Sequence, residues 1–177
     1  RTPTWLRMDS TQSTVILCPY LVLKRTVRTK EQVKKQVNIR DLGSLPYVKQ
    51  KKRKNAENNT INILNERIAP VYEEAIRRLR IRIMREAEMK NAKVIMVTSS
   101  VPGEGKTTVA VNLAVAIAKQ KKSVILVDCD MRNPSVAQMM HHDEAHPGLA
   151  SVLKDETTLQ NALTDAGIPD AEMRIMY

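Results

Sequence analysis

The segment from Ser100 to Thr108, SVPGEGKTT, carries the groups best suited to binding phosphate. It fits the P-loop pattern G-x-x-x-x-G-K-[ST], with Ser100 in the first position, where Gly is usual. Glycines let backbone N–H groups turn toward phosphate oxygens, and a helix that starts here directs its positive end at the same oxygens. We predict that Lys106 reaches the β- and γ-phosphates and that the Thr107 hydroxyl binds Mg²⁺. The predicted nucleotide-binding residues are Ser100, Val101, Pro102, Gly103, Glu104, Gly105, Lys106, Thr107 and Thr108.

Two acidic residues form a second candidate motif. Asp128 and Asp130 follow the apolar run VILV at 124–127, and parallel sheets bind ligands at the C-terminal ends of their strands. There the carboxylates can hold Mg²⁺ through water or accept a proton from a nucleophile. An Asp after a strand can also simply cap a turn, but the neighbouring P-loop favours the chemical interpretation. The predicted catalytic residues are Lys106, Asp128 and Asp130, and the predicted metal-binding residues are Thr107, Asp128 and Asp130.

These motifs need a strand, a helix and a strand in succession to bring them together. Residues 93–98, KVIMVT, predict one buried strand, and residues 123–127, SVILV, predict a second. Between them, a broad apolar face over 105–120 predicts a helix. Such a unit forms a right-handed crossover with parallel strands. The predicted fold class is α/β, with further short helices at 134–140 and 157–163.

A longer amphipathic helix is predicted upstream, from about Val71 to Met89. Apolar residues recur along it at helical spacing, which indicates ordinary core packing. Glu74, Arg77 and Arg80 lie three residues apart, so they line one flank of the helix. From the residues alone, this flank can be a solvated surface.

The net charge of +10 belongs to one segment. Lys24 to Lys54 contains 12 Lys and Arg against 2 acidic residues, and the rest of the chain has 17 of each kind. The segment is either a solvated linker or a patch that faces an anionic surface. Membrane phospholipid is the favoured anion, because no aromatic residues interleave with the lysines to stack on nucleic-acid bases. Nucleic acid is not an expected partner.

Together these residues resemble the bacterial tyrosine kinases that accompany capsule and exopolysaccharide assembly. The P-loop of that family reads much like SSVPGEGKTT, and its modified second Walker motif reads like ILVDCDMR followed by Asn133-Pro134. The helix with Glu74, Arg77 and Arg80 looks like the family's E-x-x-R-x-x-R helix. PGLASVLKDETTLQNAL at 147–163 is similar to a further stretch of the kinases, and residues 26–48 look like the segment that follows the last membrane span of the chain-length regulator.

The resemblance implies an ATP-dependent protein-tyrosine autokinase that regulates the length and export of the polysaccharide. Mg·ATP would sit on the P-loop, and a tyrosine of a neighbouring subunit would attack the γ-phosphate. Asp128 is then the better candidate for the base and Asp130 for placing Mg²⁺, although the two roles can be exchanged. Glu74, Arg77 and Arg80 would pack subunits into a homo-oligomeric ring.

The same resemblance implies the surroundings of the chain. The expected location is the cytoplasmic face of the bacterial plasma membrane, with anionic lipid of the inner leaflet bound by Lys24 to Lys54. A transmembrane chain-length regulator or activator, in the same or a separate chain, is the expected protein partner. The expected organisation is an unassigned segment at 1–25, a basic juxtamembrane-type linker at 26–65 and the N-terminal part of a P-loop kinase domain at 66–177.

Two features of the kinases are not found in the sequence. These are a Walker B motif well beyond Asp130 and a C-terminal cluster of tyrosines. We therefore expect an incomplete P-loop NTPase-type sheet that ends without a closing element and is inactive and poorly stable alone. In related folds the Walker B strand lies between the strands expected at 93–98 and 123–127.

Two other functions stay open as alternatives. P-loop ATPases of the partition and division-site type carry a signature Lys where this sequence has Val101, which counts against them. A non-enzymatic regulator of polysaccharide export, gated by nucleotide, would lack the tyrosine-rich tail of the kinases.

Overall fold

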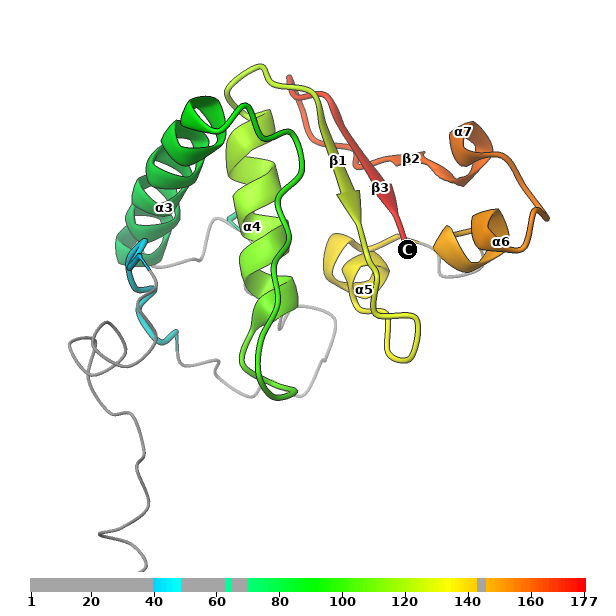
Figure 1. Ribbon diagram of the computed structural model, residues 1–177, viewed down its shortest axis with the longest axis horizontal. Coiled ribbons are helices and arrows are strands. Elements are labelled where there is room, and N and C mark those ends of the chain that lie inside the picture. Colours follow the sequence, from blue (N-terminus) through cyan, green and yellow to red (C-terminus); the bar gives the residue numbers. More distant parts are fainter. Residues whose placement is uncertain (1–39, 49–62, 65–69, 143–145) are drawn as a thin grey trace, which may run out of the picture. The chain divides into compact units, whose positions relative to one another are not determined.

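The computed structural model describes residues 40–48, 63–64, 70–142 and 146–177. The chain divides into two units, Arg1–Asp41 and Leu42–Tyr177, and every helix and strand below belongs to the second (Figure 1). The expected segment at 1–25 and most of the basic stretch from Lys24 to Lys54 lie outside the described residues. Within the described ranges, no helix has the length and apolar character needed to cross a membrane.

Three strands form a small mixed sheet with the order β1-β3-β2. Strand β1 (Val124–Val127) pairs in parallel with β3 (Met173–Met176), and the short β2 (Thr164–Asp165) pairs antiparallel with β3. The strand predicted at 123–127 is thus confirmed, but the expectation that it is buried holds for one face only. The side chains of Ile125 and Val127 are exposed, while Val124 and Leu126 pack against the core.

Strand β3 was not predicted from the sequence. The element is only four residues long, MRIM, and Arg174 interrupts its apolar pattern. In the structure Met173 and Ile175 are almost fully buried, and the strand supplies the whole parallel pairing of β1. Strand β3 is therefore a central element of the small sheet that its short, interrupted pattern did not predict.

The predicted buried strand at 93–98 is also wrong. The segment has no regular secondary structure, and the side chains of Val94 and Met96 are 87% and 84% exposed. A β-branched run favours an extended backbone, but a strand also needs a partner, and no described strand pairs with this segment. The predicted crossover from 93–98 to β1 is therefore not formed, and the parallel pair is β1 with β3 instead.

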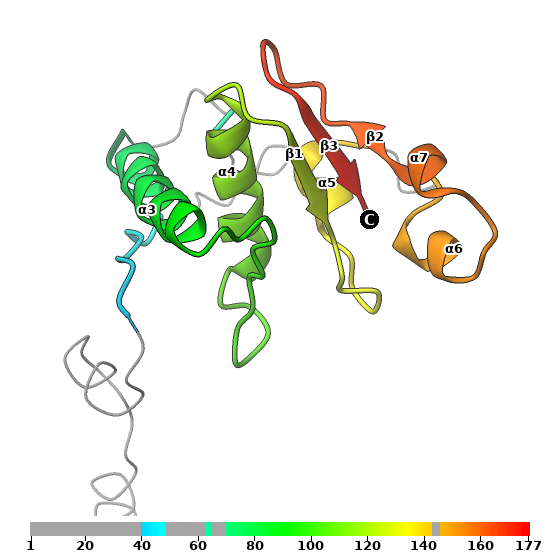
Figure 2. The same ribbon diagram turned by 45° about the horizontal axis from the view of Figure 1, so that its top comes forward.

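Helix α4 (Lys106–Ala118) is the central element and confirms the helix predicted at 105–120. Every residue from Val111 to Ala118 is buried, because α3 packs on one side and β1, β3 and α5 lie on the other (Figures 1 and 2). A helix covered from several sides is apolar around its circumference rather than along one stripe.

Helix α3 (Pro70–Met89) confirms the amphipathic helix predicted at 71–89. Pro70 occupies the first helical position, where the missing N–H costs no hydrogen bond. Tyr72 and Ile76 are buried against Ala116 of α4, with Leu45, Val48 and Ile63 packed around them. This small second cluster fixes α3 on the helix that follows the P-loop.

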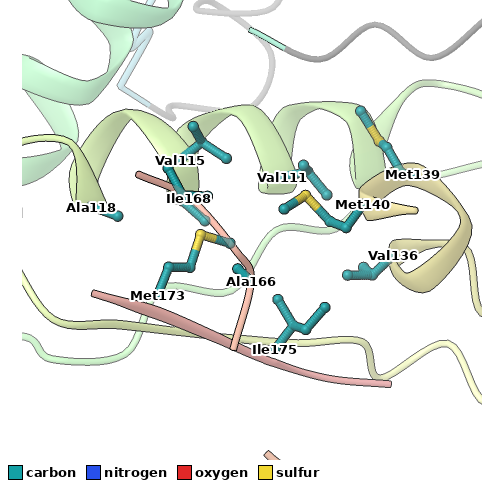
Figure 3. Packing of buried hydrophobic residues seen from close by; sticks show 11 residues of the cluster. Val111, Val115, Ala118, Val136, Met139, Met140, Ala166, Ile168, Met173 and Ile175 are labelled. Atoms are coloured by element: carbon teal, nitrogen blue, oxygen red, sulfur yellow. The ribbon is translucent and has the colours of Figure 1, made fainter. Parts of the chain in front are cut away.

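The main core lies between α4, the sheet and helix α5 (Val136–Met140), as Figure 3 shows. Two further short helices, α6 (Leu149–Leu153) and α7 (Leu159–Ala162), lie beyond it. The helices predicted at 134–140 and 157–163 are thus confirmed in shortened form. The buried residues of the main core are Val111, Ala114, Val115, Ala118, Val136, Met139, Met140, Ala166, Ile168, Met173 and Ile175.

Gly148, the residue before α6, lies against Tyr177, the residue that follows β3. A Cβ at this position would lie 1.3 Å from the carbonyl oxygen of Tyr177, so no other residue fits without moving the backbone. The neighbouring Leu149 N–H donates to the same oxygen at 3.0 Å. A glycine is therefore required here, because the backbone of Tyr177 comes too close to leave room for a Cβ.

Candidate functional site

Two glycines give the P-loop its conformation. Gly103 and Gly105 have φ angles of +83° and +88°, a region that residues with a Cβ rarely adopt. A Cβ built at either position meets no described atom within 4 Å, so the requirement comes from the backbone angle rather than from crowding. Gly105 is the N-cap of α4 and brings no side-chain cap, which leaves the start of the helix suited to an anion.

Glu104 is hydrogen-bonded to Ser100 and Val101 at the start of the P-loop. Its carboxylate accepts hydrogen bonds from the backbone N–H of Ser100 at 3.0 Å and of Val101 at 3.4 Å. The Ser100 hydroxyl also lies 3.2 Å from a Glu104 oxygen. Glu104 was predicted to lie in the nucleotide-binding site, but no specific role was predicted for it. Its contacts show that it stabilises the turn that precedes the phosphate-binding residues.

The P-loop lysine meets the acidic motif that follows β1. Lys106 Nζ lies 3.0 Å from Asp130 Oδ2, so the two segments that the sequence analysis singled out come together in space. The hydrogen bond from Lys106 lowers the pKa of Asp130, and the backbone N–H of Asn133 adds to the effect. Asp130 is consequently held as a carboxylate beside the lysine.

Asp128 anchors the loop between β1 and α5. Its Oδ1 accepts the N–H of Asp130 at 3.0 Å, and its Oδ2 accepts the N–H groups of Ser135 and Val136 at 2.9 and 3.0 Å. The side chain is buried. A carboxylate has about four lone-pair positions, so one remains for a further ligand. Turn capping, the simpler interpretation of an Asp after a strand, is therefore part of what Asp128 does.

A hydroxyl pair lies next to this anchor. Ser135 Oγ is 3.0 Å from Thr107 Oγ1, although 28 residues separate them in sequence. Sequence reasoning missed Ser135, because it belongs to no phosphate-binding pattern. Only its place seven residues after Asp128, at the start of the next predicted helix, could have drawn attention to it.

The donor set suits Mg²⁺ bound with a nucleotide. Thr107, Asp128 and Asp130 offer one hydroxyl and two carboxylates, and Mg²⁺ commonly takes one or two protein oxygens and completes its shell with phosphate and water. Among the described residues there is no cluster of three or more His, Cys, Asp or Glu that could form a protein-only cage. The chemistry of the donors therefore fits a metal that arrives with phosphate.

The predicted flank of α3 makes contacts of two kinds. The Glu74 carboxylate accepts from Arg77 at 2.6 Å and from Arg78 at 2.8 Å, and the bonds from Arg78 and Arg77 lower the pKa of Glu74. Arg80 instead donates to the carbonyl of Ala116 in α4 at 3.2 Å. The side chains of Glu74 and Arg77 are thus accessible to solvent, whereas Arg80 also connects α3 to α4 within the chain.

Comparison with protein families bears on the fold. A family model described as "ParA: NUBPL iron-transfer P-loop NTPase" matches residues 90–163, less than half of the chain. The match includes the P-loop, α4, β1 and both acidic residues. The α/β fold of the P-loop NTPase type that the sequence predicted is therefore confirmed.

Part of the chain is similar in sequence to curated bacterial tyrosine kinases. The chain is 42% identical over 74 residues to tyrosine-protein kinase YwqD of Bacillus subtilis, and 40% identical over 76 residues to tyrosine-protein kinase CpsD of Streptococcus pneumoniae. These matches cover 42% and 43% of this chain and 31% and 34% of the relatives. The chain thus spans about a third of the length of these curated relatives.

Solved structures agree with this likeness. The BceF tyrosine kinase domain matches with a TM-score of 0.69 at 25% identity, covering 86% of this chain and 62% of that domain. The resemblance to bacterial tyrosine kinases that the motifs indicated is therefore confirmed.

Proposed function

We propose, from this resemblance to bacterial tyrosine-protein kinases, that the chain is the nucleotide-binding part of a protein-tyrosine autokinase acting in capsular or exopolysaccharide assembly. The observation that carries the proposal is the 3.0 Å contact between Lys106 and Asp130. It joins the P-loop lysine to the acidic motif after β1, and Ser135, which contacts both Thr107 and Asp128, connects the Thr107 hydroxyl to the same motif. That combination suits Mg·ATP.

In this proposal each residue has a defined task. The Lys106 ammonium exchanges Asp130 for the β- and γ-phosphates and neutralises charge that grows on the transferring phosphoryl group. Thr107 and Asp130 would hold Mg²⁺, which supplies further positive charge to the phosphate oxygens when bound, and Asp128 would take the place of Asp130 if the two roles are exchanged. Asp128 is the first candidate to accept the proton of the attacking tyrosine hydroxyl, with its remaining lone pair, and Asp130 is the first candidate to place the metal.

Lys106→Ala tests the proposal at two levels. Binding of a fluorescent ATP analogue to this chain should be lost, whereas Lys119→Ala, at the far end of α4, should leave it unchanged. In the full-length protein, Lys106→Ala should lower phosphotyrosine formation from Mg·ATP by at least about a hundredfold. Undiminished phosphotyrosine in that variant would remove the P-loop from the mechanism.

The family match to an iron-transfer P-loop NTPase favours a second candidate, an ATPase that does not phosphorylate tyrosine. Val101, which is exposed, stands where partition-type ATPases carry their signature Lys, and this counts against that candidate. Release of inorganic phosphate without any phosphotyrosine in the full-length protein would favour it over the kinase. A nucleotide-gated regulator would show binding and neither product.

The proposed partners follow the same resemblance. Glu74, Arg77 and Arg80 would join subunits into a ring, and the outward position of Glu74 and Arg77 supports this. The basic stretch from Lys24 to Lys54 would bind anionic lipid at the cytoplasmic face of the plasma membrane. A transmembrane chain-length regulator or activator would complete the assembly.

A further inference from the structure

Ser135 is the N-cap residue of α5, yet its side chain does not cap the helix. Serine is favoured at this position because its oxygen usually accepts a hydrogen bond from the first turn. Here the Ser135 side chain makes no such bond, and the Asp128 carboxylate accepts the N–H groups of Ser135 and Val136 at the start of the helix. The Ser135 hydroxyl is therefore available for another contact and lies 3.0 Å from Thr107 Oγ1.

The contact with Thr107 has a chemical consequence for metal binding. A hydroxyl that binds Mg²⁺ turns a lone pair toward the cation, so its proton must point away and needs an acceptor. A serine oxygen is both donor and acceptor, and its hydrogen rotates to suit its surroundings. In the structure the Ser135 hydroxyl donates to Thr107 Oγ1. Because both hydroxyls rotate, the same pair can reverse, so that Ser135 Oγ accepts the Thr107 proton when Thr107 turns a lone pair toward Mg²⁺.

Ser135 is also held rigidly enough for this task. Its backbone N–H bonds to Asp128 at the end of β1, and the neighbouring Val136 is buried in the main core. Its side chain contacts the first turn of α4. Ser135 therefore links β1, α4 and α5 at the point where the predicted metal ligands meet.

We propose that Ser135 is a positioning residue for Mg·ATP. It accepts the hydroxyl proton of Thr107 and so fixes that hydroxyl with a lone pair directed at Mg²⁺. Ser135 itself need not touch the metal. This inference rests on the proposed nucleotide site and adds to it a residue outside both motifs.

The test compares ATP affinity of the full-length protein in excess EDTA and in saturating Mg²⁺, by titration with a fluorescent ATP analogue. Partners that orient a metal ligand typically contribute roughly ten- to hundredfold to metal affinity. Ser135→Ala should therefore reduce the gain in affinity due to Mg²⁺ by about tenfold and leave the affinity in EDTA unchanged. Ser135→Thr should restore the gain, because it keeps the hydroxyl.

Ser135→Val, which has the shape of Thr without the hydroxyl, keeps the test decisive if the Ala variant folds poorly. Thr158→Ala removes a hydroxyl that does cap a helix, α7, and should leave the Mg²⁺ effect intact. An undiminished Mg²⁺ effect in folded Ser135→Val or Ser135→Ala overturns the inference. Failure of the unaltered full-length protein to bind ATP, or equal binding by Lys106→Ala, would instead overturn the proposed function.

Discussion

In the proposed nucleotide site, Asp130 would compete with phosphate for the ammonium group of Lys106, which it contacts at 3.0 Å. Asp130→Asn removes the negative charge but keeps the shape, so phosphate no longer has to displace a carboxylate. We expect ATP affinity in EDTA to rise roughly two- to fivefold, the range of an exposed ion pair, and the gain from Mg²⁺ to fall. Titration with a fluorescent ATP analogue measures both. Asp155→Asn, an exposed acid far from Lys106 in sequence, is the control. Unchanged affinity in EDTA would show that the pair does not restrain Lys106.

The same pair predicts a pH dependence of stability. Lys106 lowers the pKa of Asp130. A carboxyl group whose pKa is lower in the folded state stabilises the fold above its unfolded pKa of about 3.9 and loses that contribution as pH falls through the folded pKa. Below about pH 4, the melting temperature of the unaltered chain should therefore fall more steeply than that of Asp130→Asn. If the melting temperatures of the unaltered chain and of Asp130→Asn fall equally with pH, the ion pair does not contribute to stability.

Tyr72 buries a hydroxyl group that has no hydrogen-bond partner among the described residues. Burial raises the pKa of Tyr72, so its neutral form contributes stability that is lost as pH rises above about 10. Tyr72→Phe keeps the ring in the cluster of α3 and removes the unsatisfied group. We expect the free energy of unfolding to increase by about 1 kcal/mol in urea titrations. A loss of stability would show that the hydroxyl has a partner.

At the scale of residues, the sequence indicates which side chains are candidates for the chemistry, but not the contacts that they make. The Gly, Lys and Thr of the P-loop and the two acids were predictable, since their spacing reports what phosphate and Mg²⁺ require. The tasks of Glu104 and Ser135 were not, because each depends on a neighbour fixed by folding. No local pattern distinguishes a serine that caps its helix from one that turns to Thr107.

At the scale of elements, Asn112 joins the helix after the P-loop to the chain that precedes α3. Its Oδ1 accepts the Ile63 N–H at 2.6 Å, its Nδ2 donates to the Thr108 carbonyl at 2.7 Å, and the residue is fully buried. Asn112→Ala leaves the Ile63 N–H without this acceptor. We expect a loss of about 1–3 kcal/mol in the free energy of unfolding and faster hydrogen exchange at Ile63. Asn161→Ala, exposed on α7, should change neither.

Helix α3 carries the prediction about assembly. Because Arg80 also bonds to α4 within the chain, Glu74→Ala with Arg77→Ala separates assembly from packing better than a triple replacement. We expect this double variant of the full-length protein to shift from ring to monomer in light scattering and to lose phosphorylation in trans. Arg85→Ala, exposed on the same helix, is the control. A variant that stays oligomeric would leave these residues as ordinary surface charges.

The long helices of this chain were more predictable than its strands, of which only β1 was predicted among the described residues. The three-to-four-residue period that defines α3 and α4 is local, so the sequence reports it directly. A strand is defined by its partner, and partners are distant in sequence. Residues 93–98 have strand composition but pair with no described strand, whereas β3 has four residues and an interrupting Arg and still completes the parallel pair with β1.

At the scale of the whole molecule, the charge is concentrated at one end of the sequence. All of the net +10 lies in Lys24 to Lys54, and the remainder, which includes the P-loop, is neutral overall. A neutral nucleotide-binding part has little general attraction for an anionic surface, so any membrane affinity should belong to the basic stretch. Each Lys or Arg close to an acidic bilayer contributes about 1 kcal/mol.

The position of this charge predicts that the chain binds anionic vesicles and that four substitutions in the basic stretch weaken the binding. The chain should sediment with vesicles containing phosphatidylglycerol and not with pure phosphatidylcholine. Replacing Lys51, Lys52, Arg53 and Lys54 by Ala should weaken this binding at least about a hundredfold, whereas replacing the scattered exposed residues Lys90, Lys119, Lys122 and Lys154 should have little effect. High salt should abolish binding, because the screening length falls from about 10 Å at 0.1 M to about 3 Å at 1 M. Equal binding to neutral vesicles, or equal losses in the two sets of variants, would show that the basic stretch is a solvated linker and that the membrane is reached by other means.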